Sequence, residues 1–346
     1  MPSSSPRVSV LIPTYNYGRF LPFTIESVLK QDFPDFELII SDDSSTDNSA
    51  EVLASYARRD PRIRVHVHSP NLGMVANWNW CLQQARGEYI KYLFGDDMLA
   101  HPSALSRLVA MLDASPSASL ATSSRLTIDD KSQVTGLWDD VRRDGIHPGH
   151  IVIAQCLRNS INLPGEPSIT LFRRAQSQRG YDSDFRQIVD LEMWFHLLLQ
   201  GDMAYTREPL CCFRIHGLQQ TAVNKQTNTG DLEMARILET YLPLLTNHVS
   251  APLNRWTQSK IRYRAARQLR KKNYFDPAFA MNLDAIQSQL SPFIRACCWF
   301  DHRLRRPFEN LSRSARKRCG KCRIIQGLPT QLAFLSSLSP LAPPRY

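Results

Sequence analysis

Short apolar runs alternate with amphipathic segments over the N-terminal part of the chain. The runs are rich in β-branched residues, as buried parallel strands are, and lie at residues 8–12, 36–40, 62–68 and 89–94. The segments between them repeat apolar residues at helical spacing and lie at residues 20–31, 47–56 and 77–85. Strands and helices in alternation predict an α/β fold built on an open, mostly parallel sheet.

Polar residues gather where two of these strands end. Asp42 and Asp43 follow the second strand directly, and Asp96 and Asp97 follow the fourth strand after Gly95. Ligands of such sheets bind at the carboxyl ends of the strands, so we expect a site there. We expect Asp97 to lie at the solvent edge of its strand.

The alternation loosens in the second half of the chain. The expected elements are a helix from residue 102, an irregular stretch at 138–148, a strand at 168–172, an apolar helix at 191–199 and strands around Pro209 within 203–215. Beyond about residue 252 the alternation stops. We therefore expect a catalytic domain over residues 1–250 and a basic, mainly helical extension over residues 251–346. Its Pro/Ser-rich end, from residue 336, is expected to be loose.

Charge divides the chain at the same place. The net charge is +10, and the part from Leu253 onward holds 19 Lys and Arg against 4 Asp and Glu. The remainder is mildly acidic, which argues against a nucleic-acid groove in the main domain. Apolar residues within residues 293–304 share one helical face. We expect peripheral attachment of the tail to an anionic cytoplasmic leaflet, the alternative being a basic helix packed on the catalytic domain.

Cysteines and apolar stretches exclude several other classes. Of eight cysteines only Cys319 and Cys322 have ligand spacing, and a closed zinc site needs a second such pair. The N-terminus lacks the apolar core of a signal peptide, and no stretch approaches the roughly 20 apolar residues of a spanning helix. We expect reduced thiols in a cytoplasmic protein.

The acidic residues have both functional and structural interpretations. Asp43 suits recognition of a nucleobase imino group and a ribose hydroxyl, or an N-cap for the next helix. Asp96 and Asp97 side by side suit Mg²⁺ or Mn²⁺ with substrate phosphates, or an ordinary surface turn. Asp190 suits a general base for an incoming hydroxyl, or the cap of the helix that follows it. A single histidine such as His216 is more often structural than a ligand.

The order of these segments resembles the family 2 glycosyltransferases of the GT-A fold. The residues that carry the resemblance are VSVLIPTYN at 8–16, FELIISDDSSTD at 36–47, NLG at 71–73, ARGEYI at 85–90, GDD at 95–97, PS at 167–168, FRR at 172–174, DLEMW at 190–194 and FRIH at 213–216. The resemblance covers about residues 6–220. Ser44 departs from the pattern, since many relatives have Gly there.

The resemblance implies a role for each matched residue. The positions of Thr14, Tyr15 and Asp43 line the nucleotide in this family, and Asp43 is the one that meets the base. The position of Asp96 belongs with the ribose and metal motif, and that of Asp97 is the more direct metal ligand.

The resemblance also implies roles further along the chain. The position of Asp190 is the catalytic base of inverting members, and that of His216 adds a metal ligand or a phosphate contact. The implied reaction is a single displacement, with Mg²⁺ or Mn²⁺, from a UDP- or dTDP-sugar to a glycan or lipid-linked acceptor.

Three other classes remain as alternatives of different weight. An inactive relative that binds nucleotide or glycan as a scaffold would keep the same fold, and donor turnover would distinguish it. A nucleotidyltransferase needs a Gly-rich phosphate loop after the first strand, where residues 13–18 read PTYNYG. A dehydrogenase needs GxGxxG after a strand, and the chain has none.

Overall fold

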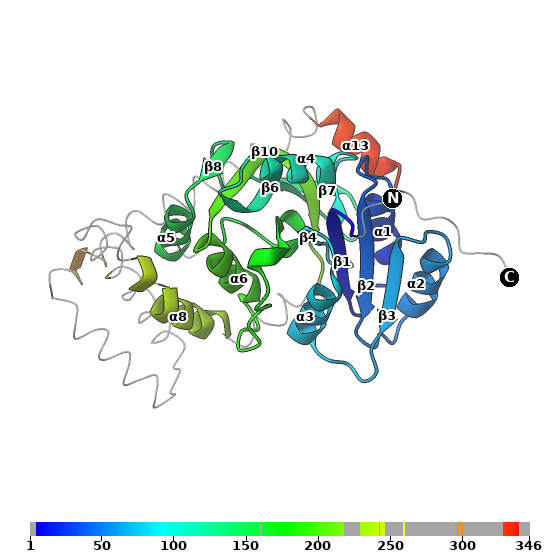
Figure 1. Ribbon diagram of the computed structural model, residues 1–346, viewed down its shortest axis with the longest axis horizontal. Coiled ribbons are helices and arrows are strands. Elements are labelled where there is room, and N and C mark those ends of the chain that lie inside the picture. The colour runs from blue at the N-terminus through cyan, green and yellow to red at the C-terminus, as the bar shows by residue number, and fades with distance from the viewer. Residues whose placement is uncertain are drawn as a thin grey trace.

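The N-terminal strands form the parallel part of one sheet (Figure 1). The computed structural model describes residues 5–159, 161–217, 229–241, 243–245 and 328–338, with isolated residues at 259, 292, 296, 297 and 299. The strands are β1 (Val8–Thr14), β2 (Phe36–Asp42), β3 (Ile63–Val67) and β4 (Tyr89–Tyr92). They lie in the order β3-β2-β1-β4, and Thr14 pairs with Asp42 at the carboxyl edge. This part of the sheet follows the predicted alternation.

Helices cover both faces of the sheet. The helices of the first half are α1 (Leu21–Leu29), α2 (Ser49–Ala57), α3 (Met74–Gln84) and α4 (Ala104–Asp113). Side chains of α1, α2 and α4 form one core with Val10 and Ile12 of β1, whereas those of α3 form a second core with Leu11. Neighbouring residues of a strand point to opposite faces, so β1 contributes to both cores.

The second half extends the sheet with antiparallel and parallel neighbours. Its elements are β5 (Met98–Leu99), β6 (Ala118–Ile128), β7 (Val134–Trp138), β8 (Gly145–His147), α5 (Gly149–Asn159), η1 (Pro167–Ile169), β9 (Leu171–Arg173), η2 (Arg174–Gln176), α6 (Val189–Leu198), β10 (Asp202–Arg214), α8 (Thr229–Tyr241) and η3 (Pro243–Leu245). Strand β9 joins β4 to β6 antiparallel to both, and β6 pairs with β10 in parallel. Helices α5 and α6 share the core of α3.

Strand β6 was missed by the hydrophobic pattern. It reads ASLATSSRLTI, yet all its residues are buried because it lies between β9 and β10. Its hydroxyls find internal acceptors: Thr122 donates to the Pro164 carbonyl at 2.7 Å and Ser124 to the Arg207 carbonyl at 2.6 Å. Buried hydroxyl groups that are hydrogen-bonded are tolerated in a core, so the polarity of this strand hid it.

Other expectations for this half need correction. The stretch at 138–148 is not all irregular, since it contains β8 and the end of β7. Residues 203–214 belong to one strand, β10, whose register against β6 shifts on both sides of Pro209. Helix α5 was not expected either.

Part of the C-terminal extension packs on the catalytic core. Helix α13 (Pro329–Ser336), red in Figure 1, places Phe334 in one apolar cluster with Met98 and Ile128. Leu338 is fully buried there, so the expectation of a loose end from residue 336 is wrong for residues 336–338. The predicted membrane-binding helix at 293–304 and Cys319 and Cys322 lie outside the described residues, apart from single positions. Within the described part of the chain, no helix has the length and apolar character to cross a membrane.

Candidate functional site

Asp43 does not cap a helix, because both its oxygens bind another loop. Its Oδ1 atom accepts from the Leu72 amide at 2.7 Å and its Oδ2 atom from the Gly73 amide at 2.9 Å. The Asn71 side chain donates to the Asp43 carbonyl at 2.6 Å. Asp43 therefore fixes the residue 71–73 loop, which the sequence did not predict. Its carboxylate stays at the carboxyl end of β2, where the base-binding hypothesis needs it.

Thr14 and Tyr15 lie beside Asp43 at the end of β1. The Thr14 carbonyl accepts from the Asp43 amide at 2.9 Å. The Thr14 hydroxyl is buried and has no hydrogen-bond partner among the described residues, whereas Tyr15 is 48% exposed. A Cβ atom on Gly95 would lie 2.6 Å from the Thr14 hydroxyl, so β1 and the Asp96–Asp97 turn require glycine at this contact.

Asp97 is buried and not at a solvent edge, contrary to expectation. Its side chain retains 1% exposure, and its Oδ1 atom accepts from the Arg214 amide at 2.9 Å. The Thr24 hydroxyl of α1 donates to the Asp97 carbonyl at 2.7 Å. Helix α1 and strand β10 thus fix this turn from two sides.

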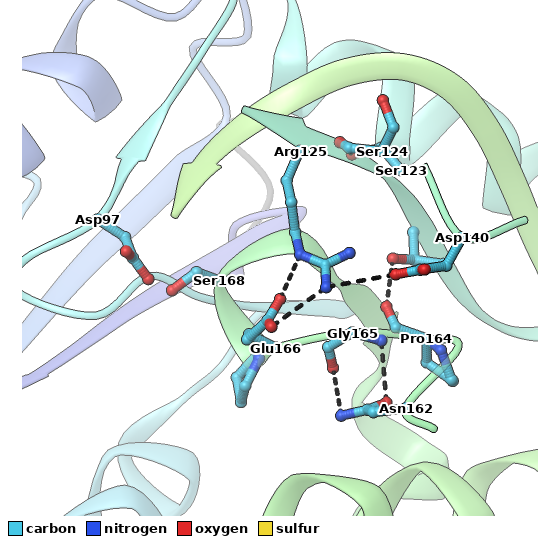
Figure 2. Close-up of polar contacts among 12 residues, drawn as sticks. Asp97, Ser123, Ser124, Arg125, Asp140, Asn162, Pro164, Gly165, Glu166 and Ser168 are labelled. Carbon is cyan, nitrogen blue, oxygen red and sulfur yellow. Dashed lines mark hydrogen bonds and ion pairs between the residues drawn. The ribbon is translucent and has the colours of Figure 1, made fainter. Parts of the chain in front are cut away.

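Burial raises the pKa of Asp97 well above its usual range, and the neighbouring charge of Asp96 raises it further. The Ser168 hydroxyl, which points toward Asp97 in Figure 2, opposes that rise. The Oδ2 atom is buried and receives no hydrogen bond of ordinary geometry within the described chain. A carboxylate oxygen without a hydrogen bond, in a pair of adjacent acidic side chains, fits a divalent cation. The cation would offset both the cost of burying the charge of Asp97 and its repulsion by Asp96.

The described residues contain no cluster of three or more His, Cys, Asp or Glu suited to a metal. A cation on Asp97 would therefore take most of its ligands from substrate phosphates and water. Mg²⁺ and Mn²⁺ bind in this way in many phosphate-handling sites, with only one or two carboxylates from the protein. The residues present fit such a cation.

His216 contacts Asp96, while the metal hypothesis placed it beside Asp97. Its Nε2 atom lies 3.0 Å from the Asp96 Oδ2 atom, and its ring packs against Phe20 and Tyr17. Burial raises the pKa of Tyr17, and the charge of Asp96 raises it further. Sequence analysis assigned no role to Tyr17. His216 as a direct metal ligand stays a prediction, and in this structure it orients Asp96.

Asp190 is not the residue that caps α6. Ile188 precedes the helix, and Asp190 lies within its first turn. The Oδ1 atom accepts from the Leu191 amide at 2.8 Å and the Oδ2 atom from the Asn162 side chain at 2.8 Å. Burial, together with a smaller contribution from the charge of Glu166, raises the pKa of Asp190 to about 7. A carboxyl group with this pKa is suited to proton transfer near neutral pH.

A turn before η1 carries further candidate residues that the sequence did not single out. Asn162 holds the turn by accepting from the Gly165 amide at 3.0 Å and donating to the Gly165 carbonyl at 3.1 Å. Arg125 of β6 forms an ion pair with Glu166 at 2.6 Å (Figure 2). The available signals were a lone arginine in a polar run and an Asn-x-x-Gly turn, and neither is specific.

Comparison with known proteins identifies the family. The profile described as Glycosyl transferase family 2 matches residues 9–160. The putative teichuronic acid biosynthesis glycosyltransferase TuaG of Bacillus subtilis (strain 168) is 31% identical over 206 residues, which is 59% of this chain and 77% of TuaG. The chain belongs to glycosyltransferase family 2.

Solved structures show the fold of this glycosyltransferase independently. Staphylococcus aureus TarS 1–349 in complex with UDP-GlcNAc superposes with a TM-score of 0.58 at 16% identity, over 75% of this chain and 72% of TarS 1–349. The mannosyltransferase PcManGT of Pyrobaculum calidifontis, in complex with GDP-Man and Mn²⁺, superposes with a TM-score of 0.52 at 18% identity. This match covers 87% of this chain and 85% of PcManGT. The predicted GT-A-type α/β fold and the transferase class are confirmed.

The family profile ends before Asp190 and His216. The match assigns no role to any single residue within its range either, so the individual roles of the candidate residues stay predictions: Thr14, Tyr15, Asp43, Asp96, Asp97, Asp190 and His216. The structure brings Thr14 and Asp43 together, and it brings His216 to Asp96. It connects Asp97 and Asp190 through the segment of residues 162–168, because Asn162 binds Asp190 and Ser168 faces Asp97.

Proposed function

We propose that this glycosyltransferase inverts the anomeric centre as it moves a sugar from a metal-bound UDP- or dTDP-sugar to an acceptor hydroxyl. The observation that carries the proposal is the state of Asp190. Its carboxyl is partly buried, oriented from two sides and raised in pKa to about 7. A base with a pKa near the working pH combines a useful ionised fraction with a real affinity for the proton it removes.

Asp190 would take the proton of the acceptor hydroxyl during the displacement. The Asn162 amide and the Leu191 backbone N–H bind its two oxygens and leave their other lone pairs for the hydroxyl. These contacts fix the direction in which the carboxylate points. Orientation of this kind contributes to catalysis because less freedom is lost when the reacting groups meet.

Asp97 is the residue that would hold the cation through its Oδ2 atom. Bound there, Mg²⁺ or Mn²⁺ supplies electrostatic stabilisation of the departing nucleoside diphosphate. The chain's own contribution is to keep Asp97 in place through the Arg214 amide and the contact of Thr24 with the turn. His216 orients the neighbouring Asp96 through its Oδ2 atom.

Asp43 would select the base. Each of its oxygens already accepts one backbone N–H, and an ionised carboxylate has about four acceptor sites, so acceptor capacity remains. The imino N–H of uracil or thymine can use that capacity, whereas adenine has no such group. We expect UDP to bind at least about tenfold more tightly than ADP, the value of one hydrogen bond to a charged group. Equal affinities in calorimetric titration would contradict this assignment.

The names of the relatives favour a polysaccharide acceptor. TuaG is described as a teichuronic acid biosynthesis enzyme, and TarS was solved with UDP-GlcNAc. A glycan or lipid-linked acceptor in bacterial cell-surface polysaccharide synthesis fits both. Attachment of the basic tail to the cytoplasmic leaflet would bring the site to a lipid-linked acceptor.

Attachment of the tail to a membrane is better tested by a substitution than by a deletion. Removal of the C-terminal segment would expose the apolar cluster that Phe334 and Leu338 fill. Exchange of the basic residues between Arg313 and Arg323 for glutamine leaves α13 in place. We expect co-sedimentation with anionic liposomes to be lost in this variant and in high salt. Binding that ignores lipid charge would refute the hypothesis.

A donor screen tests the whole proposal. UDP-, dTDP-, GDP- and ADP-sugars are incubated with the protein, and nucleoside diphosphate release is measured with Mn²⁺ or Mg²⁺ and with a chelator. We expect release from UDP- or dTDP-sugars that depends on the cation. Binding of UDP without turnover of any donor would favour the inactive scaffold instead.

A further inference from the structure

Arg125 is a buried cation that no part of the proposed reaction uses. Its side chain is 7% exposed, and its guanidinium lies over the Trp138 ring at 4.8 Å. The Glu166 Oε2 atom lies 2.6 Å from the Arg125 Nε atom, and the Asp140 Oδ2 atom lies 3.8 Å from the Arg125 Nη2 atom (Figure 2). The two acidic side chains remain partly open to solvent, at 24% for Glu166 and 34% for Asp140, although the Glu166 Oε2 atom itself is buried. A buried arginine that holds two partly exposed acidic side chains resembles a recognition surface more than a core contact.

Glu166 lies between the two groups assigned to the chemistry. The preceding residue, Gly165, is bound by Asn162, whose amide also donates to Asp190. Two residues later, the hydroxyl of Ser168 faces Asp97. Glu166 is thus in the short segment that links the base to the carboxylate at the diphosphate. Its charge acts on both Asp97 and Asp190.

The charges of this cluster favour one class of ligand. Two carboxylates, Glu166 and Asp140, face one guanidinium, Arg125, so the cluster carries an excess of negative charge. The nearby Ser123 and Ser124 hydroxyls already donate to backbone carbonyls. What remains accessible is mainly acceptor oxygen, which binds hydroxyl donors and repels anions.

We propose that Glu166, held in place by Arg125, forms a subsite for the hydroxyl groups of an uncharged pyranose and excludes anionic sugars. The inference rests on the proposed function, because it places a sugar between Asp97 and Asp190. The pyranose is either the sugar of the donor or the terminal sugar of the acceptor. Both present the same hydroxyl chemistry, and two arms of one experiment distinguish them.

The donor arm compares UDP-glucose with UDP-glucuronate, which differ by the charged carboxylate. Calorimetric affinities are measured with Mn²⁺ for the wild type and for Glu166→Gln. If the donor sugar occupies the subsite, the wild type binds UDP-glucuronate at least about tenfold more weakly. Glu166→Gln reduces that difference to about twofold while UDP binds as before.

The acceptor arm compares para-nitrophenyl glucoside with para-nitrophenyl glucuronide as stimulators of UDP release. If the wild type is stimulated less by the glucuronide and Glu166→Gln reduces that difference, the subsite belongs to the acceptor.

Two further variants separate charge from folding. Arg125→Met combined with Glu166→Gln and Asp140→Asn removes all three charges of the cluster, so no unpaired charge is left, and it should lose the same discrimination. Glu26→Gln breaks a comparable pair, with Arg59 at 3.4 Å, between α1 and the end of α2, and should change nothing. The inference is overturned if the wild type accepts both sugars equally in both arms, or if Glu166→Gln and the uncharged combined variant discriminate as the wild type does. If UDP itself does not bind to the wild type, the proposed function on which this inference rests is wrong.

Discussion

Asp43, Asp96 and Asp97 follow the parallel strands β2 and β4, which lie on either side of β1, whereas Asp190 and Glu166 come from a helix and from a turn. The first group is placed by the sheet itself, since strands in parallel register end at the same edge. The second group is placed by contacts across long sequence separations, such as that of Asn162 with Asp190 and that of Arg125 with Glu166. The position of the residues on the sheet therefore follows from the fold itself, whereas the position of Asp190 and Glu166 depends on individual side-chain contacts.

The difference predicts how each half responds to substitution. Changes on the sheet side should remove a chemical group and leave the geometry intact. Changes around residues 162–168 should move a catalytic group that is itself unaltered.

The largest effect is expected for Asp97→Asn. The amide keeps an acceptor for the Arg214 N–H but binds a divalent cation weakly, so several kcal/mol of leaving-group stabilisation are lost. We expect nucleoside diphosphate release to fall at least about a thousandfold, as it should for the wild type in chelator. The thermal midpoint should not fall, since a costly buried charge is removed. Asp184→Asn, at an exposed ion pair, is the control. Full turnover of the wild type in chelator would contradict the assignment of a catalytic cation to Asp97.

The pH dependence should report Asp190. As a base it must be ionised, and burial raises its pKa to about 7, so turnover should fall about tenfold for each pH unit below that value and level off above it. The Asn162 hydrogen bond favours the ionised form, so Asn162→Ala should move the midpoint to higher pH. A rate profile measured on both proteins checks this. A midpoint near 4 in the wild type would exclude Asp190 as the titrating group.

A pair of glycine substitutions separates strain in the site from strain elsewhere. Gly165 has φ +86° and Gly145 has φ +121°, conformations in which alanine costs about 1–2 kcal/mol. Both alanine variants should lose stability in thermal unfolding, and Gly165→Ala should lose more, because its Cβ atom would lie 2.3 Å from the Ile169 Cδ1 atom whereas that of Gly145 meets nothing within 4 Å. Only Gly165→Ala should also lower turnover, because its turn holds Asn162 against Asp190. Equal activity of the two variants would show that the turn does not position the base.

The smallest effect concerns the turn after Asp43. Ser44 adopts φ +66°, where a side chain is disfavoured. We expect Ser44→Gly to raise the free energy of unfolding by up to about 1 kcal/mol and to leave activity unchanged. Ser44→Ala keeps the Cβ atom and should bring no gain. Denaturant unfolding compares the three proteins, and a destabilised Ser44→Gly would mean that the hydroxyl has a role.

Sequence predicted the sheet half of the site well, for a physical reason. Apolar runs mark buried strands, and polar residues directly after them must meet at one edge, so Asp43 and Asp97 were placed from local pattern alone. The sequence did not predict that Asp97 is buried, because α1 and β10 enclose it from distant positions. Nor did it predict that Asp43 binds the loop of Gly73.

The other half depends on packing that local pattern does not encode. Strand β6 has the composition of a loop, and its burial follows from its neighbours β9 and β10. Since β6 was missed, the position of Arg125 opposite Glu166 was missed with it. Asp190 was found through the family resemblance, but only the structure shows that it lies inside α6 and not before it.

The most direct test of the account is Asp190→Asn, studied for donor binding, turnover and stability together. We predict UDP affinity close to that of the wild type and turnover lower by about 10²–10⁴, the scale of a lost general base. Because the pKa of Asp190 is higher in the folded state than in the unfolded state, this carboxyl lowers the free energy of unfolding once the pH exceeds its unfolded pKa. The variant lacks this cost, so it should melt no lower than the wild type at pH 8. Turnover within a few fold of the wild type, or a variant that melts early and binds no UDP, would contradict the assignment of Asp190 as the base.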